Sequence, residues 1–417
     1  MGRLIVQGRI TNHNFSAYSQ VEISRRTGLI TRVGPRLGSP DIITEGLIFP
    51  GFGDLHVHAR EDASGKQNYK EDFHTASLAA INGGVTFFAE MPNNPVAPTT
   101  DERYRTKQRL AESSLVPVIL YAGIGPDTGP LSQDVPYKAF MGPSVGDLFF
   151  KSQCRLEQTI REYRGRPVSF HCEDPEVLKQ NERQPTHEQR RPNGAEVAAI
   201  ELALKLIETH LLIGNICHVS TREGLMKIIE AKRRGINVTV EATPHNLFFD
   251  DSMITAENRP WLQVNPPIRS VADRKFLLEN DGRMNFDYLA TDHAPHTKEE
   301  KLKGTSGLPQ LDTYGAFTTW LMKECGIMPN EIARICSYNP GRFVRPFLPE
   351  RYGKGFGAIE EGYAGSLTIM DIGAPITVSE RMLKTKCGWS PFKGVMFPGS
   401  VTHTIVMGKV YPVKCGL

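Results

Sequence analysis

Short apolar segments recur through the middle of the chain, with amphipathic stretches between them. The segments are rich in β-branched and aromatic residues, which is typical of buried parallel strands, and the stretches between them have helical periodicity. Eight strands are expected, over Phe52–His58, Val85–Met91, Val116–Ala122, Tyr137–Met141, Val168–Cys172, Asn215–Val219, Asn237–Glu241 and Tyr288–Asp292. Helices are expected over Lys70–Asn82, Asp101–Glu112, Ala195–His210, Thr221–Arg234 and Val271–Glu279. This alternation predicts an α/β fold, a (β/α)8 barrel of the TIM type, with an open doubly wound sheet as the competing topology.

The two ends of the chain follow a different pattern. Residues 1–49 contain short alternating strands at Leu4–Gln7, Gln20–Ile23 and Leu29–Val33, separated by turn signals. Residues 346–417 also contain short alternating strands, at Gly365–Asp371 and Thr402–Tyr411. Neither end alone has enough apolar surface for a core. We therefore expect 1–49 and 346–417 to form one small β-sandwich beside a barrel of residues 50–345.

Composition narrows the class of protein. The 417 residues carry 49 basic and 46 acidic side chains, a formal net charge of +3, which does not suggest nucleic acid or a membrane surface as a partner. No apolar run approaches the ~18 residues of a membrane helix, and the N-terminus lacks the apolar region of a secretory signal. Seven scattered cysteines without a Cys-x-x-Cys pair indicate neither disulfides nor a thiolate zinc site. A cytoplasmic enzyme is the expectation.

Side chains with metal-binding chemistry stand at the ends of five expected strands. In a parallel barrel the carboxyl ends of all strands meet at one mouth, where catalytic groups gather. The groups are therefore expected to converge, and they are His56, His58, Lys138, His171, His218 and Asp292.

Each of these groups also has an ordinary structural interpretation. His56 and His58 lie on one face of a strand and can reach one metal ion, but two unrelated histidines have the same spacing by chance. His171 and His218 could be hydrogen-bonded core histidines. Asp292 follows an apolar strand, where a cation would offset the cost of a buried carboxylate, although it could instead cap the next helix.

Lys138 differs from the other groups because an ammonium has no lone pair for a metal. Carbamylation by carbon dioxide would convert its side chain into a carboxylate able to bridge two cations. The alternative is an ordinary solvated lysine, which most lysines are.

The order of these motifs resembles the amidohydrolase superfamily and, within it, the dihydroorotases. The similarity runs almost from end to end of the chain. It rests on Gly53–Arg60, Lys70–Phe73, Gly83–Thr86, Met91–Asn93, Lys138–Met141, Phe170–Glu173, Ile216–Val219, Glu241–His245, Asn265–Arg269, Ala290–His296 and Asn339–Pro340.

This resemblance implies a binuclear centre. Two divalent ions, with zinc expected, would share an activated hydroxide, and carbamylated Lys138 would bridge them. His56, His58 and Asp292 would hold the first ion and His171 and His218 the second, with Asp292 also acting as the catalytic proton shuttle.

The resemblance also implies a substrate. Dihydroorotases interconvert N-carbamoyl-L-aspartate and L-dihydroorotate in pyrimidine biosynthesis. Contacts to this small molecule are expected from His58, Arg60, Asn93, Asn265, His296, Ser306 and Gly307, with Arg60, Asn93 and His296 on the α-carboxylate.

Related functions remain as alternatives. Allantoinases share the Lys138–Met141 motif, and dihydropyrimidinases bind uncharged rings, whereas Arg60, Asn93 and Asn265 favour a substrate with a free carboxylate. A third alternative is an inactive scaffold that supports an aspartate transcarbamoylase. The resemblance also suggests a homodimer. The charged segment Thr297–Gln310 is expected to be a solvated loop or, alternatively, a lid over the substrate.

Overall fold

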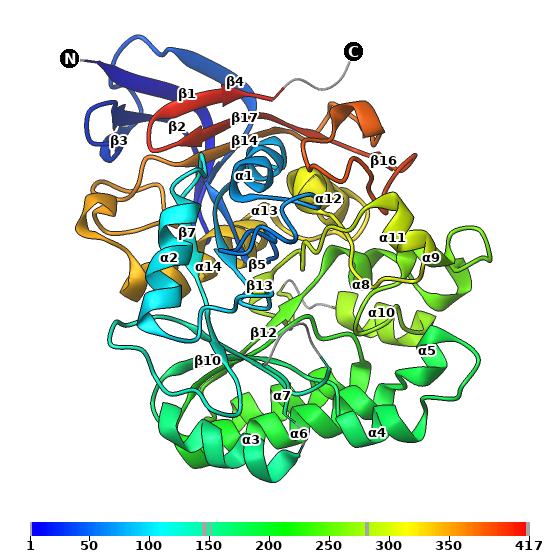
Figure 1. Cartoon of the computed structure of the whole chain (residues 1–417). Helices are drawn as coiled ribbons and strands as arrows, with labels where there is room; N and C mark the ends of the chain where they lie inside the picture. Colours follow the sequence, from blue (N-terminus) through cyan, green and yellow to red (C-terminus); the bar gives the residue numbers. More distant parts are fainter. Residues whose placement is uncertain (1, 144–147, 151, 280–282, 414–417) are drawn as a thin grey trace.

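The computed structural model describes residues 2–143, 148–150, 152–279 and 283–413. Its middle is a parallel (β/α)8 barrel (Figure 1), so the predicted barrel is confirmed and the open sheet is wrong. Each predicted strand coincides with an observed one. The barrel strands are β5 (Phe52–Val57), β6 (Val85–Glu90), β7 (Val118–Leu120) continued by β8 (Ala122–Ile124), β9 (Tyr137–Phe140), β10 (Pro167–His171), β11 (Ile213–Ile216), β12 (Val238–Ala242) and β13 (Tyr288–Leu289).

The barrel closes through backbone hydrogen bonds at two seams. Strands β5 to β7 form one sheet and β8 to β13 the other. At the first seam, Tyr121 N donates to Glu90 O over 3.0 Å. At the second, His58 N donates to His293 O over 2.8 Å and His293 N donates to His56 O over 3.3 Å. The second seam therefore joins the ends of the first and last barrel strands, which carry the candidate ligands His56, His58 and Asp292.

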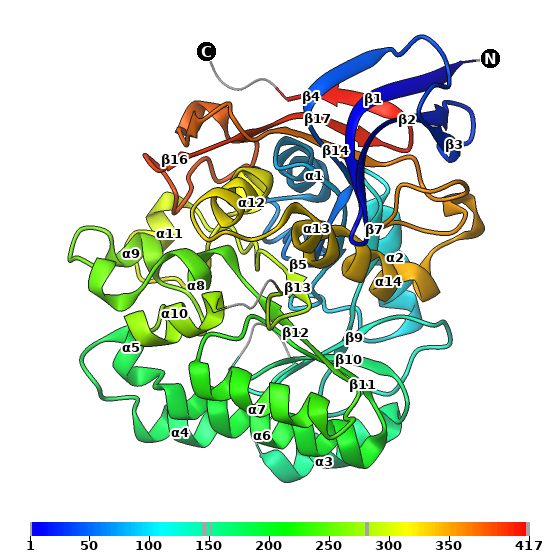
Figure 2. The same cartoon turned by 180° about the vertical axis from the view of Figure 1, so that it is seen from behind.

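Helices surround the barrel, and all five predicted ones are present. Figure 2 shows α6 and α7 on the outer side of β11 and β12. The α-helices are α1 (Phe73–Asn82), α2 (Asp101–Ala111), α3 (Gln153–Ile160), α4 (Pro175–Gln180), α5 (His187–Arg190), α6 (Asn193–His210), α7 (Arg222–Arg233), α8 (Pro244–Phe248), α9 (Arg259–Leu262), α10 (Val271–Leu278), α11 (Lys298–Leu302), α12 (Tyr314–Lys323), α13 (Pro329–Ala333) and α14 (Asn339–Val344).

Helix α1 begins at Phe73 rather than at Lys70 because Asp72 caps it. The Asp72 side chain accepts a hydrogen bond from Thr75 N over 2.7 Å, in an arrangement that satisfies donors otherwise left free in the first turn. The residues before the cap belong to the loop that follows β5. Lys70 is consequently free to lie at the mouth of the barrel instead of on the helix.

The two chain ends join in one seven-stranded sheet, at the top of Figure 1. Its core is aliphatic and separate from that of the barrel. This sheet is the β-sandwich predicted from the alternating pattern at the two chain ends. We propose that the domain boundaries lie between residues 49 and 50 and between residues 345 and 346. In spatial order its strands are β18 (Lys409–Pro412), β17 (Ser400–Val406), β14 (Leu367–Asp371), β4 (Ile42–Pro50), β1 (Arg3–Thr11), β2 (Ser16–Ser24) and β3 (Ile30–Gly34); β15 (Ile376–Thr377) and β16 (Met396–Phe397) form a separate pair.

The C-terminal segment also reaches the barrel mouth. The Trp389 indole donates to His296 O over 2.7 Å, and the Thr385 hydroxyl donates to the Glu71 carboxylate. Within the described residues, no helix is long and apolar enough to cross a membrane. The cysteines in those residues are free thiols, and Cys415 lies outside them.

Candidate metal centre and active site

A cavity of about 380 Å³ opens at the carboxyl ends of the barrel strands. Every candidate site residue except Lys138 lines it. Those residues are His56, His58, Arg60, Asn93, His171, His218, Asn265, Asp292, His296, Ser306 and Gly307. The structure thus brings together residues that are up to about 250 positions apart in the sequence.

Three groups in this cavity converge closely enough to hold one ion. Asp292 Oδ1 lies 3.1 Å from His58 Nε2 and 3.3 Å from His56 Nε2. His56 Nδ1 lies 2.8 Å from Glu241 Oε2, so this imidazole can donate to Glu241 while Nε2 keeps its lone pair for a metal. Burial lowers the pKa of His58 to about 3. The two imidazoles and the carboxylate form a donor set that suits zinc.

His171 and His218 form a second pair beside the first group. His171 Nδ1 lies 3.0 Å from His218 Nε2, and His171 Nε2 lies 2.9 Å from Glu173 Oε2. Burial and the neighbouring His171 lower the pKa of His218 well below its usual value. A neutral imidazole is the form that binds a metal, and the separation of the two nitrogens suits ligands of one ion.

Lys138 lies beneath these histidines and is fully buried. Its Nζ donates to Cys217 Sγ over 2.7 Å and lies 5.4 Å from the centre of the Phe140 ring. Among the described residues, no carboxylate lies within ion-pair distance of this nitrogen. An uncompensated buried ammonium is costly, whereas a carbamate facing two cations is not. The environment of Lys138 fits the modified side chain better than the unmodified one.

The backbone at the barrel mouth is strained at site residues. Arg60, His218 and Asp292 have positive φ angles of 64°, 38° and 48°, a region that residues other than glycine seldom occupy. Each follows the end of a barrel strand. All three side chains line the same cavity, and such strain is common where function demands a particular geometry.

The outer part of the cavity is cationic. Arg60 is buried, and its guanidinium lies 3.1 Å from His296 Nε2 while its Nε donates to Pro295 O over 3.3 Å. Burial, Arg60 and Lys70 lower the pKa of His296 well below its usual value, so its ring is neutral. Asn265 Oδ1 is a buried acceptor without a hydrogen-bond partner among the described residues. These groups offer donors for an anion and an acceptor for an N–H group.

Ser306 and Gly307 border the same cavity. A β-carbon on Gly307 would lie 2.5 Å from Ala294 O and 2.9 Å from His296 Cδ2, and the residue has a φ of 138°. Only glycine allows the loop to approach His296 so closely.

Thr297–Gln310 is predicted to be a solvated loop, and this prediction is wrong for the middle of the segment. The segment contains helix α11, and Lys301 within it is fully buried. Its Nζ donates to Gln263 O over 2.8 Å, Thr305 O over 2.7 Å and Gly307 O over 2.9 Å. A lysine whose three donors are all used holds the segment against the barrel mouth.

Several residues at the site received no role from the sequence. Glu241 and Glu173 contact the imidazoles of His56 and His171, Cys217 contacts Lys138, and Lys70 and Glu300 contact His296. Glu241 and Cys217 could have been predicted from their place at a strand end, the same feature that identifies the candidate ligands. Lys70 and Glu300 stand in loops or short helices and carried no comparable signal.

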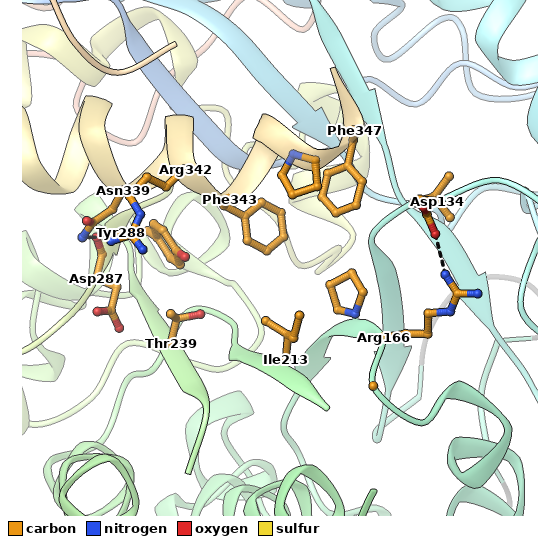
Figure 3. A pocket seen from close by; sticks show the side chains of 14 residues that line it. Asp134, Arg166, Ile213, Thr239, Asp287, Tyr288, Asn339, Arg342, Phe343 and Phe347 are labelled. Carbon is orange, nitrogen blue, oxygen red and sulfur yellow. Dashed lines mark hydrogen bonds and ion pairs between the residues drawn. The ribbon is translucent and has the colours of Figure 1, made fainter. Parts of the chain in front are cut away.

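A second cavity, of about 510 Å³, lies at the opposite end of the barrel (Figure 3). Pro167, Ile213 and Tyr288, which line it, are the first residues of their strands. Its Arg166 already pairs with Asp134 over 2.5 Å. The amino ends of barrel strands contribute to stability rather than to catalysis, so the active-site candidate is the cavity with the histidines.

A barrel with a β-sandwich and this donor set defines a metal-dependent amidohydrolase. Solved structures with the same fold include the L-hydantoinase (dihydropyrimidinase) of Arthrobacter aurescens, with a TM-score of 0.87 and 22% identity over 100% of this chain and 97% of that one. The dihydropyrimidinase of Brevibacillus agri has a TM-score of 0.84 and 19% identity over 98% and 95%.

Sequence comparison identifies the family. Residues 45–133 match the dihydro-orotase-like family model. The chain is 32% identical to the dihydroorotase of Pyrococcus furiosus over 87% of this chain and 81% of that protein. It is 33% identical to the dihydroorotase of Thermococcus kodakarensis over 98% and 94%. The chain belongs to the dihydroorotase family.

The contact between Glu241 and His56 generates a prediction about metal affinity. Glu241→Gln removes the charge that makes His56 a stronger ligand, so the affinity for the first ion should fall about 10–100-fold. Competition with a chromophoric chelator measures this directly. Glu230→Gln, on the outer helix α7, is the matched control and should leave the affinity unchanged. Equal affinities in wild type and Glu241→Gln would remove Glu241 from the metal centre.

Proposed function

We propose that the chain catalyses the reversible cyclisation of N-carbamoyl-L-aspartate to L-dihydroorotate, the dihydroorotase step of pyrimidine biosynthesis. One observation carries the choice of substrate. Arg60 is buried at the cavity, and no carboxylate among the described residues lies within ion-pair distance of its guanidinium. A buried cation without an anionic partner favours a ligand that brings the negative charge.

The α-carboxylate of the substrate supplies that charge. Arg60 would bind it with two parallel hydrogen bonds, and Asn93 and His296 would add donors. The oxygen of Asn265 would accept from an N–H of the ureido group. Neutral rings such as hydantoins and dihydrouracil would leave Arg60 without an anionic partner, which disfavours them as substrates in this cavity.

The donor set fits two divalent ions, and we propose zinc as the metal. His56, His58 and Asp292 would hold one ion, His171 and His218 the other, and carbamylated Lys138 would bridge them. When bound, such ions activate water and polarise the amide carbonyl.

Asp292 is proposed to move the proton in the reaction. Burial alone would raise its pKa, but His56 and His58 lower the pKa well below the usual value, so the carboxylate is ionised at neutral pH. In ring opening, water adds to the ring carbonyl and the C–N bond breaks; Asp292 takes a proton from the attacking water and delivers it to the departing nitrogen. In ring closure, Asp292 returns a proton to the oxygen that leaves as water.

Three further expectations rest on the family. We propose that the enzyme is a homodimer, that it is located in the cytoplasm and that it associates with an aspartate transcarbamoylase. Measuring the mass of the native protein in solution, alone and mixed with the transcarbamoylase from the same source, tests the two assemblies.

The substrate assignment is tested by a panel of rings. Purified protein supplied with zinc and bicarbonate should open L-dihydroorotate and leave dihydrouracil and allantoin intact, as followed by the loss of ring absorbance. The difference arises because only dihydroorotate carries a carboxylate for Arg60. Turnover of a neutral ring instead would overturn the role of Arg60, and turnover of none would favour the inactive scaffold.

The Arg60 contact generates a second prediction. Arg60→Lys keeps the charge but loses the paired hydrogen bonds, so KM for carbamoyl aspartate should rise about 10–100-fold with a smaller change in kcat. Arg103→Lys, on the exposed face of α2, serves as the control. An unchanged KM in Arg60→Lys would show that Arg60 does not bind the substrate.

A further inference from the structure

Lys70 brings a second cation to the carboxylate end of the cavity. The residue lies in the loop between β5 and α1, lines the cavity and is only 7% exposed. Its Nζ lies 3.2 Å from His296 Nδ1 and 3.0 Å from Glu300 Oε1. Nothing in the proposed reaction yet accounts for a buried lysine at this place.

Glu300 fixes the position of the Lys70 ammonium. It is the third residue of helix α11, where its Oε2 accepts from Thr297 N over 3.1 Å in a capping box. The Tyr69 hydroxyl donates to Glu300 Oε1 over 2.6 Å. Because the carboxylate is held from both sides, the ammonium that pairs with it stays beside the His296 ring.

The neutral His296 ring has a single N–H proton, which is on either Nδ1 or Nε2. Its neutral form carries one N–H and one lone pair. Arg60 can only donate, and its guanidinium lies 3.1 Å from Nε2, so Nε2 accepts in this arrangement. The N–H is then on Nδ1, which lies 3.3 Å from Glu300 Oε2. In this tautomer Glu300, and not Lys70, is the partner of Nδ1.

The substrate requires the opposite tautomer. A carboxylate can only accept hydrogen bonds, so His296 must present an N–H at Nε2 when it binds one. The lone pair then moves to Nδ1, where it needs a donor. Lys70 Nζ is within hydrogen-bond distance of that nitrogen. A proton passes from Nδ1 to water and another is taken from water at Nε2, so the ring stays neutral.

We propose that Lys70 is a positioning residue for substrate binding, which holds His296 in the tautomer that donates from Nε2 to the substrate carboxylate. The proposal rests on the proposed function. Glu300 serves the other tautomer, so the Lys70–Glu300 pair allows His296 to exchange one partner for the other without leaving a buried nitrogen unsatisfied.

Substitution of Lys70 tests this role kinetically. Lys70→Met removes the donor, and KM for L-dihydroorotate should rise about tenfold or more, while kcat changes much less because the proton shuttle is untouched. Lys70→Arg restores a cationic donor and should recover most of the loss. Lys66→Met, at an exposed position of the same loop, is the matched control. A KM for Lys70→Met within about twofold of wild type would overturn the proposal.

A spectroscopic test separates positioning from a merely structural role. Ring 15N resonances of histidine-labelled protein are measured in an equilibrium mixture of dihydroorotate and carbamoyl aspartate, with His296 assigned by its loss in His296→Asn. In wild type Nε2 should carry the proton, and in Lys70→Met the proton should move toward Nδ1. The same tautomer in both proteins would contradict the inference. Absence of dihydroorotate turnover in wild type would instead contradict the proposed function.

Discussion

The convergence of buried nitrogen and oxygen donors at one end of the barrel is the constraint on which the rest of the structure depends. Four imidazoles, a carboxylate and a lysine meet where water is largely excluded. Without cations, adjacent lone pairs such as those of His171 and His218 would face each other at hydrogen-bond distance with one proton between them at most. Two ions and a carbamate, as proposed, would resolve this arrangement, because the ions would supply positive charge to the donors and the carbamate would remove it from Lys138.

Other features of the fold serve to hold this cluster in place. The seam between β5 and β13 brings His56 and His58 beside Asp292, and Glu241 and Glu173 orient individual rings. On the substrate side, buried Lys301 secures the segment that carries Gly307. The C-terminal segment adds the hydrogen bond from Trp389. The sandwich formed by the chain ends is thus continuous with elements that shape the substrate cavity.

The alternation of strands and helices was sufficient to predict the barrel, and the strand-end pattern was sufficient to predict that the candidate metal-binding residues converge at its mouth. His56, His58, His171, His218 and Asp292 lie at or just beyond the carboxyl end of a barrel strand, and Lys138 lies within β9. The parallel topology makes these strand ends meet. Strand β4 could not be predicted from a regular pattern. Its first half alternates exposed and intermediate residues, whereas Leu47–Phe49 are continuously buried. The burial of Lys301 was also beyond prediction. Its local sequence is highly charged, and its partners are three backbone carbonyls, all of them in segments without regular structure.

The absence of an acidic partner for Arg60 could not be seen in the sequence either. Glu90, Asp292 and Glu300 are close enough to interact electrostatically with Arg60. Glu90, however, pairs with Lys107, Glu300 with Lys70, and Asp292 contacts His56 and His58. Only the three-dimensional pairing shows that the Arg60 guanidinium, at the substrate side of the cavity, has no carboxylate partner among the described residues. That cation, more than the metal-binding motif, supports the proposal of a carboxylate substrate over a neutral ring.

The most direct test of the account is the chemical state of Lys138. Protein prepared with 13C-bicarbonate and zinc should show one carbamate carbon resonance and two ions per chain, and Lys138→Ala should lose the resonance and bind the metal far more weakly. A Lys138→Ala protein that kept both ions as tightly as wild type, or a wild-type protein with two ions and no carbamate signal, would contradict the central place given to this lysine.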